Sequence, residues 1–162
     1  FERGLEMNPV RASAIGDYRF NDQYANSLSP EYLEASRKMD EEFLARLLEI
    51  DREALSRQDQ LSYDMFRIDR EESLEGNRFP GHLQPINQFG NMMNFFVQLG
   101  SGSSAQPFNT VKDYENWLSR ADDFVTNVDQ MIVNMKEGMQ QGIVQPRILM
   151  EKVVLAYSGG LV

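Results

Sequence analysis

The 162-residue chain contains no cysteine and a single histidine, His82. The lack of cysteine excludes a disulfide framework and a zinc site built on thiolates, although it does not identify a cellular compartment. A histidine-based zinc site, such as one on a His-Glu-x-x-His helix, needs two or three spaced ligands, which one histidine cannot supply. We therefore expect this chain to contain no catalytic residue, no cofactor-binding residue and no metal ligand.

Long apolar runs and an excess of positive charge are also missing. The most apolar window, residues 92 to 99, is far shorter than the roughly 20 residues of a membrane-spanning helix. The net charge is -9, from 25 acidic and 16 basic residues. Proteins that bind nucleic acid present a cationic surface to the phosphates, so this balance argues against a nucleic-acid partner. The acidic residues are spread along the chain, as is typical of a solvated surface.

The clearest pattern in the sequence is a run of apolar residues with helical periodicity. Thr110 and Asp113 have the spacing of a capping box, and Gly142 stands where a left-handed C-cap would end the helix. The pattern predicts a helix over about 111–140, about 45 Å long at 1.5 Å per residue. We expect its apolar stripe to be buried along the whole helix; the stripe comprises Tyr114, Trp117, Leu118, Ala121, Phe124, Val125, Val128, Met131, Ile132, Met135 and Met139.

Other helix starts follow the same rules. Ser29-Pro30 begins a helix that should bury Leu33, Met39, Phe43, Leu44, Leu47 and Leu48. Ser56 and Asp59 begin a third helix with Leu61, Met65 and Ile68 on its buried face. Tyr63 and Phe66 broaden that face, and the helix should end near Gly76. A helix before Asp17 that is interrupted near Pro9 and a helix after Pro146 complete an all-α fold. We expect residues 1–162 to form one helical domain, an antiparallel helical bundle with a long ordered loop at about 78–109. A helix-like piece at residues 91–98 lies inside this loop.

Within that loop, the sequence Pro85-Ile86-Asn87-Gln88-Phe89-Gly90 is the best candidate for a binding function. Asn87 and Gln88 place two side-chain amides next to each other, between proline, glycine and aromatic residues. They could offer donors and acceptors to a peptide and so line a substrate cleft. Alternatively, they fix the backbone of the loop itself. Both interpretations remain open.

Three other groups of residues have simpler interpretations. The acidic runs at 40–42 and 69–72 include or neighbour arginines, which indicates surface ion pairs rather than a metal site. The stretch 100–103 lacks the lysine of a phosphate-binding loop, so we expect a turn. Met131, Met135 and Met139 share one helix face. That spacing favours core packing over a methionine-rich binding groove.

Several stretches together resemble a known family. These are residues 55–66, Arg78-Phe79-Pro80, Pro85-Ile86-Asn87-Gln88, Pro107-Phe108 with Val111 and Asp113-Tyr114, and residues 137–147 followed by Glu151-Lys152-Val153. In this order they are similar to the bacterial domain-of-unknown-function family 885, from about residue 9 to 154. The resemblance implies an exported protein, periplasmic or lipid-anchored, that is longer than 162 residues. It also implies a helical later region with a His-Glu zinc motif like that of metallopeptidases.

The resemblance places zinc, as the cofactor, in that downstream region and none in this sequence. The chain begins with Phe1 and stops shortly after its last helix starts, so we expect an N-terminal fragment that is inactive by itself. Its partners would be the downstream region and a peptide substrate, and its function would be to wall or lid a peptide cleft. The alternative is a stand-alone protein-interaction module with a Met- and Phe-rich binding face.

Overall fold

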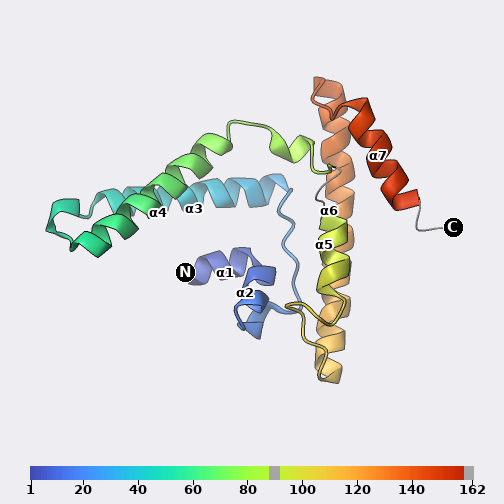
Figure 1. Cartoon of the computed structure of the whole chain (residues 1–162), viewed down its shortest axis with the longest axis horizontal. Helices are drawn as coiled ribbons and strands as arrows, with labels where there is room; N and C mark the ends of the chain where they lie inside the picture. The colour runs from blue at the N-terminus through green and yellow to red at the C-terminus, as the bar shows by residue number, and fades with distance from the viewer. Residues whose placement is uncertain (88–91, 159–162) are drawn as a thin grey trace. The chain divides into compact units, whose positions relative to one another are not determined.

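The computed structural model describes residues 1–87 and 92–158, and within these ranges every regular element is helical. The predicted all-α class is therefore confirmed. None of the described helices is both long and apolar enough to span a membrane. The α-helices are α1 (Glu2–Met7), α2 (Pro9–Ala14), α3 (Pro30–Leu48), α4 (Arg57–Gly76), α5 (Met92–Leu99), α6 (Val111–Gln141) and α7 (Arg147–Ser158), with short 3-10 turns η1 (Tyr18–Phe20), η2 (Arg52–Ala54) and η3 (Gly81–Leu83) (Figure 1).

The chain forms two compact units. The first contains residues 1–29 and 81–162, and the second contains residues 30–80. The second unit is a hairpin in which α3 and α4 pack against each other, with η2 between them. As predicted, α3 starts at Pro30 and α4 starts directly after Ser56, whose hydroxyl accepts a hydrogen bond from the backbone N–H of Asp59 at 3.2 Å.

Ion pairs join the two helices of the hairpin. Asp40 of α3 is buried; one carboxylate oxygen accepts from Arg70 and the other accepts from the Ser73 hydroxyl at 2.6 Å. Arg52 of η2 forms a two-pronged pair with Asp64 of α4, at 2.8 and 2.7 Å. Asp40 was expected to form a surface ion pair, and the structure buries it between the helices.

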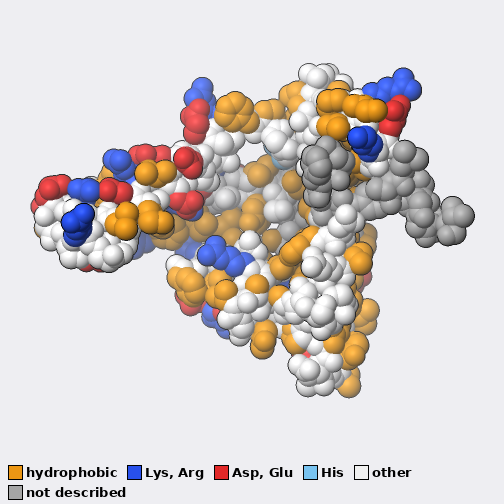
Figure 2. Space-filling view, in the orientation of Figure 1, with side chains coloured by type: hydrophobic (Ala, Val, Ile, Leu, Met, Phe, Trp, Pro, Cys, Tyr) orange, Lys and Arg blue, Asp and Glu red, His pale blue; other side chains and the backbone are white. Residues whose placement is uncertain are grey.

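The predicted buried face of α4 is confirmed only at Tyr63, which is the buried residue of this helix. Leu61, Met65, Phe66 and Ile68 were expected on the same face and are exposed. The ion pairs fix the rotation of α4, because Asp64 and Arg70 must face α3 and η2. The apolar residues are thereby turned outward. On α3 the expected inward residues are half-buried except Leu48, which is exposed. Figure 2 shows hydrophobic and charged side chains mixed on the surface of this hairpin.

The long helix α6 has the predicted ends. Thr110 and Asp113 form the capping box, and Gly142 adopts the left-handed conformation with φ of 73°. Its burial differs from the prediction. The fully buried residues are Arg120, Asn127, Met131, Asn134 and Gly138, so polar side chains occupy most inward positions. Trp117, Phe124, Val128 and Met135 are half-buried, while Tyr114, Leu118, Val125, Ile132 and Met139 are exposed.

Backbone hydrogen bonding explains the polar inward face. The segment from the end of η1 to α3 is irregular and crosses α6, so side chains of α6 can donate to its carbonyl groups. Arg120 donates to the carbonyl oxygens of Gln23 at 2.9 Å and Phe20 at 2.8 Å. Asn134 donates to the carbonyl of Leu28 at 3.0 Å. The apolar stripe is therefore rotated, with one flank in the core and the other facing outward.

An aromatic cluster fills the buried flank. The ring of Phe96 on α5 is stacked on Trp117 and Phe124, with centroids 4.5 and 4.0 Å apart. Tyr24 meets Phe96 and Phe124 edge-on at 5.6 and 5.5 Å. The turn at 100–103 was predicted. Its first residue, Gly100, also lies against Trp117, where a Cβ atom would be 2.4 Å from the indole ring.

Candidate functional site

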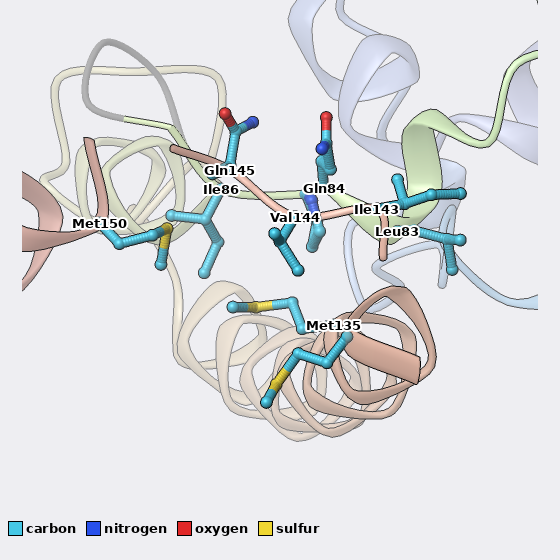
Figure 3. A pocket seen from close by; sticks show the side chains of 10 residues that line it. Leu83, Gln84, Ile86, Met135, Ile143, Val144, Gln145 and Met150 are labelled. Carbon is cyan, nitrogen blue, oxygen red and sulfur yellow. The ribbon is translucent and has the colours of Figure 1, made fainter. Parts of the chain in front are cut away.

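A pocket lies where η3 and the loop after it meet the C-terminal half of α6 and the start of α7 (Figure 3). All of these elements belong to the first unit. The pocket has a volume of about 160 Å³. Its lining residues are Leu83, Gln84, Pro85, Ile86, Met135, Met139, Ile143, Val144, Gln145 and Met150.

A glycine-dependent reversal of the chain forms one wall of the pocket. At Gly142 the backbone takes a positive φ, which L-residues with a side chain rarely adopt. The chain then returns along α6, and the backbone N–H of Ile143 donates to the carbonyl of Gly138 at 2.8 Å. Ile143, Val144 and Gln145 follow as lining residues before α7 begins. The C-cap of the long helix therefore positions this wall.

The opposite wall also approaches α6 at Gly138. A Cβ atom on Gly138 would lie 2.6 Å from the carbonyl oxygen of Ile143 and 3.1 Å from that of Leu83. No side chain fits there, so glycine is what allows η3 to lie against the helix. The Leu83 side chain is 3% exposed and fixes η3 at this point. The absence of a side chain at position 138 therefore allows both walls of the pocket to lie against α6.

The pocket interior is apolar and its edge carries two amides. Figure 3 shows the side chains of Ile86 and Val144 pointing toward α6, while the amide ends of Gln84 and Gln145 lie on the side away from that helix. Met135 and Met139 of α6 and Met150 of α7 supply thioethers, which adapt to differently shaped apolar groups. Among the described residues that line the pocket, none has an ionisable side chain, so this lining suits an apolar group with peptide-like polar atoms beside it.

The structure describes only residues 85–87 of the predicted binding segment at 85–90. Pro85 and Ile86 line the pocket, and Asn87 follows them with an exposed side chain. Gln88, Phe89 and Gly90 lie outside the described residues, so the proposed pairing of amides at 87 and 88 stays a prediction. Leu83, Gln84 and the segment after Gly142 were missed. The glycine that ends α6, followed by Ile143 and Val144, was the available signal, because it places apolar residues directly after a chain reversal.

Metal-binding groups are not gathered in the part of the chain that the structure describes. No cluster of three or more histidine, cysteine, aspartate or glutamate side chains occurs in residues 1–87 and 92–158. His82 is half-buried in η3, next to Leu83, and is not among the residues that line the pocket. The described lining residues therefore offer packing and hydrogen bonding.

Comparison with known proteins supports one relationship. No curated protein and no solved structure has a significant match to the chain. A family model described as a bacterial protein of unknown function (DUF885) matches residues 9–162. This match spans almost the whole sequence and agrees with the family that the sequence motifs predicted. The chain therefore belongs to the DUF885 family of bacterial proteins.

Proposed function

We propose that this chain is the N-terminal, non-catalytic helical part of an exported, zinc-dependent peptidase-like protein, in which it forms a wall of the peptide cleft. The pocket beside α6 carries this proposal. Its apolar interior would receive a side chain of the peptide, while the amides of Gln84 and Gln145 at its edge would bond to the peptide backbone. Apolar cavities of about 150 Å³ accept a group as large as benzene, so a leucine or phenylalanine side chain matches the volume of about 160 Å³.

The zinc in this proposal would be bound downstream. The residues described here do not fit a zinc site, since the sequence contains one histidine and no cysteine, and no three-ligand cluster occurs in the described ranges. We therefore assign to this chain substrate binding and exclusion of water, and no step of bond cleavage. Export to the periplasm or a lipid anchor is part of the same proposal and rests on the family resemblance.

The pocket can be tested with methyl NMR on the 162-residue chain labelled at its methionines. We expect acetyl-Gly-Gly-Leu-Gly-Gly-amide to shift the methyl signals of Met135, Met139 and Met150, which line the pocket. Met39 and Met65 lie on α3 and α4 and serve as internal controls. The equivalent all-glycine peptide should leave every signal in place. Equal shifts of all methionines, or none at the pocket, would contradict peptide binding at this site.

A second candidate is the stand-alone protein-interaction module. The three methionines of the pocket favour it, because thioether side chains suit surfaces that bind varied partners. The support for phenylalanine in such a binding face is weaker, because Phe96 is already stacked on Trp117 and Phe124 within the first unit. The downstream reading frame separates the two candidates. A His-Glu-x-x-His helix there supports the peptidase-like protein, and a stop codon soon after Val162 supports the module.

A further inference from the structure

The outward flank of α6 carries a second pattern, which shares Met135 and Met139 with the pocket lining. Val111, Tyr114, Leu118, Val125, Ile132 and Met139, here called the outer stripe, are between 46 and 77% exposed. Their spacing of three, four, seven, seven and seven residues follows a strict heptad over the whole helix. The intermediate positions Ala121, Val128 and Met135 are apolar and half-buried. A sustained heptad of apolar residues is the sequence pattern of a helix that packs against another helix.

The two edges of the outer stripe differ. On one edge, Trp117, Phe124 and Met131 are half-buried or buried in the first unit. On the other edge, Glu115, Asp122 and Asp129 recur every seven residues, and all three are exposed. Glu115 has a surface pair with Lys112 at 3.9 Å, whereas Asp122 and Asp129 make no ion pair with any residue in the described ranges. Figure 2 shows hydrophobic side chains along the α6 side of the molecule.

Charge decides which occupant fits. A second copy packed antiparallel would bring like edges together, with Asp122 against Asp129 of the copy and opposite charges only at Glu115 and Lys136, in a chain whose net charge is already -9. A parallel copy would set the acidic edge against Trp117 and Phe124, which already pack against Phe96 of α5. An extended peptide would find no backbone partners on a helix surface, since the helix uses its own. A helix whose apolar seam is bordered by basic residues avoids all three problems. It would pair with the acidic edge, leave Trp117 and Phe124 packed against α5, and satisfy its own backbone.

We propose that the outer stripe docks an amphipathic α-helix whose apolar seam is bordered by lysine or arginine, supplied by the downstream region of the longer polypeptide. The assignment of the helix to the downstream region rests on the function proposed above. Its apolar seam and basic edges are inferred from the residues of α6 alone. Basic side chains would face Glu115, Asp122 and Asp129. Lys136, which continues the same series, would face an acid. This arrangement of three acids and one base fixes the direction in which the partner helix lies.

The chemistry can be tested with two designed helical peptides of four heptads that share a leucine seam. One carries lysine at its edges and the other carries glutamate. By calorimetric titration of the 162-residue chain at low salt, we expect the lysine-edged peptide to bind about tenfold or more tightly, a difference of about 1.4 kcal/mol. The triple variant Glu115→Lys, Asp122→Lys and Asp129→Lys should reverse this preference. Leu118→Ser with Val125→Ser should weaken both peptides.

A matched control uses apolar residues that are exposed elsewhere. Leu61→Ser with Met65→Ser on α4 should leave both affinities unchanged. Equal affinity for the two peptides, or a preference that ignores the triple variant, would overturn the proposal. So would sedimentation showing a dimer that Leu118→Ser dissociates, because the stripe would then belong to a second copy. These results do not depend on the methionine signals of the pocket, so this proposal and the proposed function can fail separately.

The source of the helix needs the longer protein. Since the chain has no cysteine, Leu118→Cys gives this region one reactive thiol. We expect this thiol to react with a maleimide at least about tenfold more slowly in the longer protein than in the 162-residue chain, because docking would bury it. Met65→Cys controls for general changes in reactivity. Equal rates for Leu118→Cys in both proteins would overturn the assignment to the downstream region.

Discussion

Arg120 Nη2 donates a hydrogen bond to the Ser13 hydroxyl oxygen at 3.0 Å, which joins the middle of α6 to the end of α2 across 107 residues of sequence. The same guanidinium donates to Gln106 Oε1 at 2.6 Å and to two backbone carbonyls. All four acceptors are uncharged. Burial lowers the pKa of Arg120 to about 10, although Asp22, Tyr24 and Asp123 oppose that shift. One side chain thus ties together the N-terminal segment, the loop before α6 and α6 itself.

Replacing this arginine should destabilise the chain. Arg120→Met keeps most of the volume but leaves buried acceptors without donors, each of which costs about 1–3 kcal/mol. We expect the free energy of unfolding to fall by about 3–5 kcal/mol in urea melts. Arg147→Met removes an arginine that is 92% exposed and should change stability by less than about 0.5 kcal/mol. Similar melts for the two variants would show that the Arg120 hydrogen bonds do not hold the unit together.

Gly138→Ala tests how the pocket is built. The new methyl group would lie 2.6 Å from the Ile143 carbonyl oxygen, so η3 or the segment after Gly142 must move away from α6. We expect a loss of about 1–3 kcal/mol, as for other overpacked sites, and loss of the leucine-peptide shifts at Met135 and Met139. Gly4→Ala on α1 is the control, because its Cβ atom would meet nothing within 4 Å. That variant should be neutral or more stable, by about 0.5–1 kcal/mol.

Asn87 and Gln88 allow a test in the longer protein. If they line the cleft, Asn87→Ala with Gln88→Ala should raise the KM for peptide cleavage or lower kcat. The melting temperature should stay nearly unchanged, because the Asn87 side chain is exposed. A large loss of thermal stability with intact turnover would instead assign the two amides to the structure of the loop. Activity and melting measured on the same preparation decide between these interpretations.

Zinc content tests where the chemistry lies. A catalytic zinc needs about three protein ligands and an open position for water. We expect the 162-residue chain to retain no stoichiometric zinc after dialysis and to cleave no member of a broad peptide library. Elemental analysis and mass spectrometry of the digests give the two readouts. One equivalent of tightly held zinc, or cleavage that a chelator abolishes, would show that catalytic residues lie within this chain.

The sequence by itself determined where most helices begin and end. Local rules suffice for this, because the capping box of Thr110 and Asp113, the Ser56 cap and the left-handed Gly142 each depend on a few neighbouring residues. The same locality explains why α5 and the break at Pro9 could be predicted. The sequence also identified the family, because the motifs of the family occur along it in a fixed order.

Tertiary structure decided which helix faces are buried. The periodicity of α4 and α6 predicted an apolar side, but not the rotation of each helix against its neighbours. In α4, the pairs of Asp40 with Arg70 and Arg52 with Asp64 turn Leu61 and Met65 outward. In α6, Arg120 and Asn134 face inward because they satisfy carbonyl groups of a segment about 100 residues away. Such partners are distant in sequence, so no local pattern records them, and the pocket and the outer stripe both follow from these rotations.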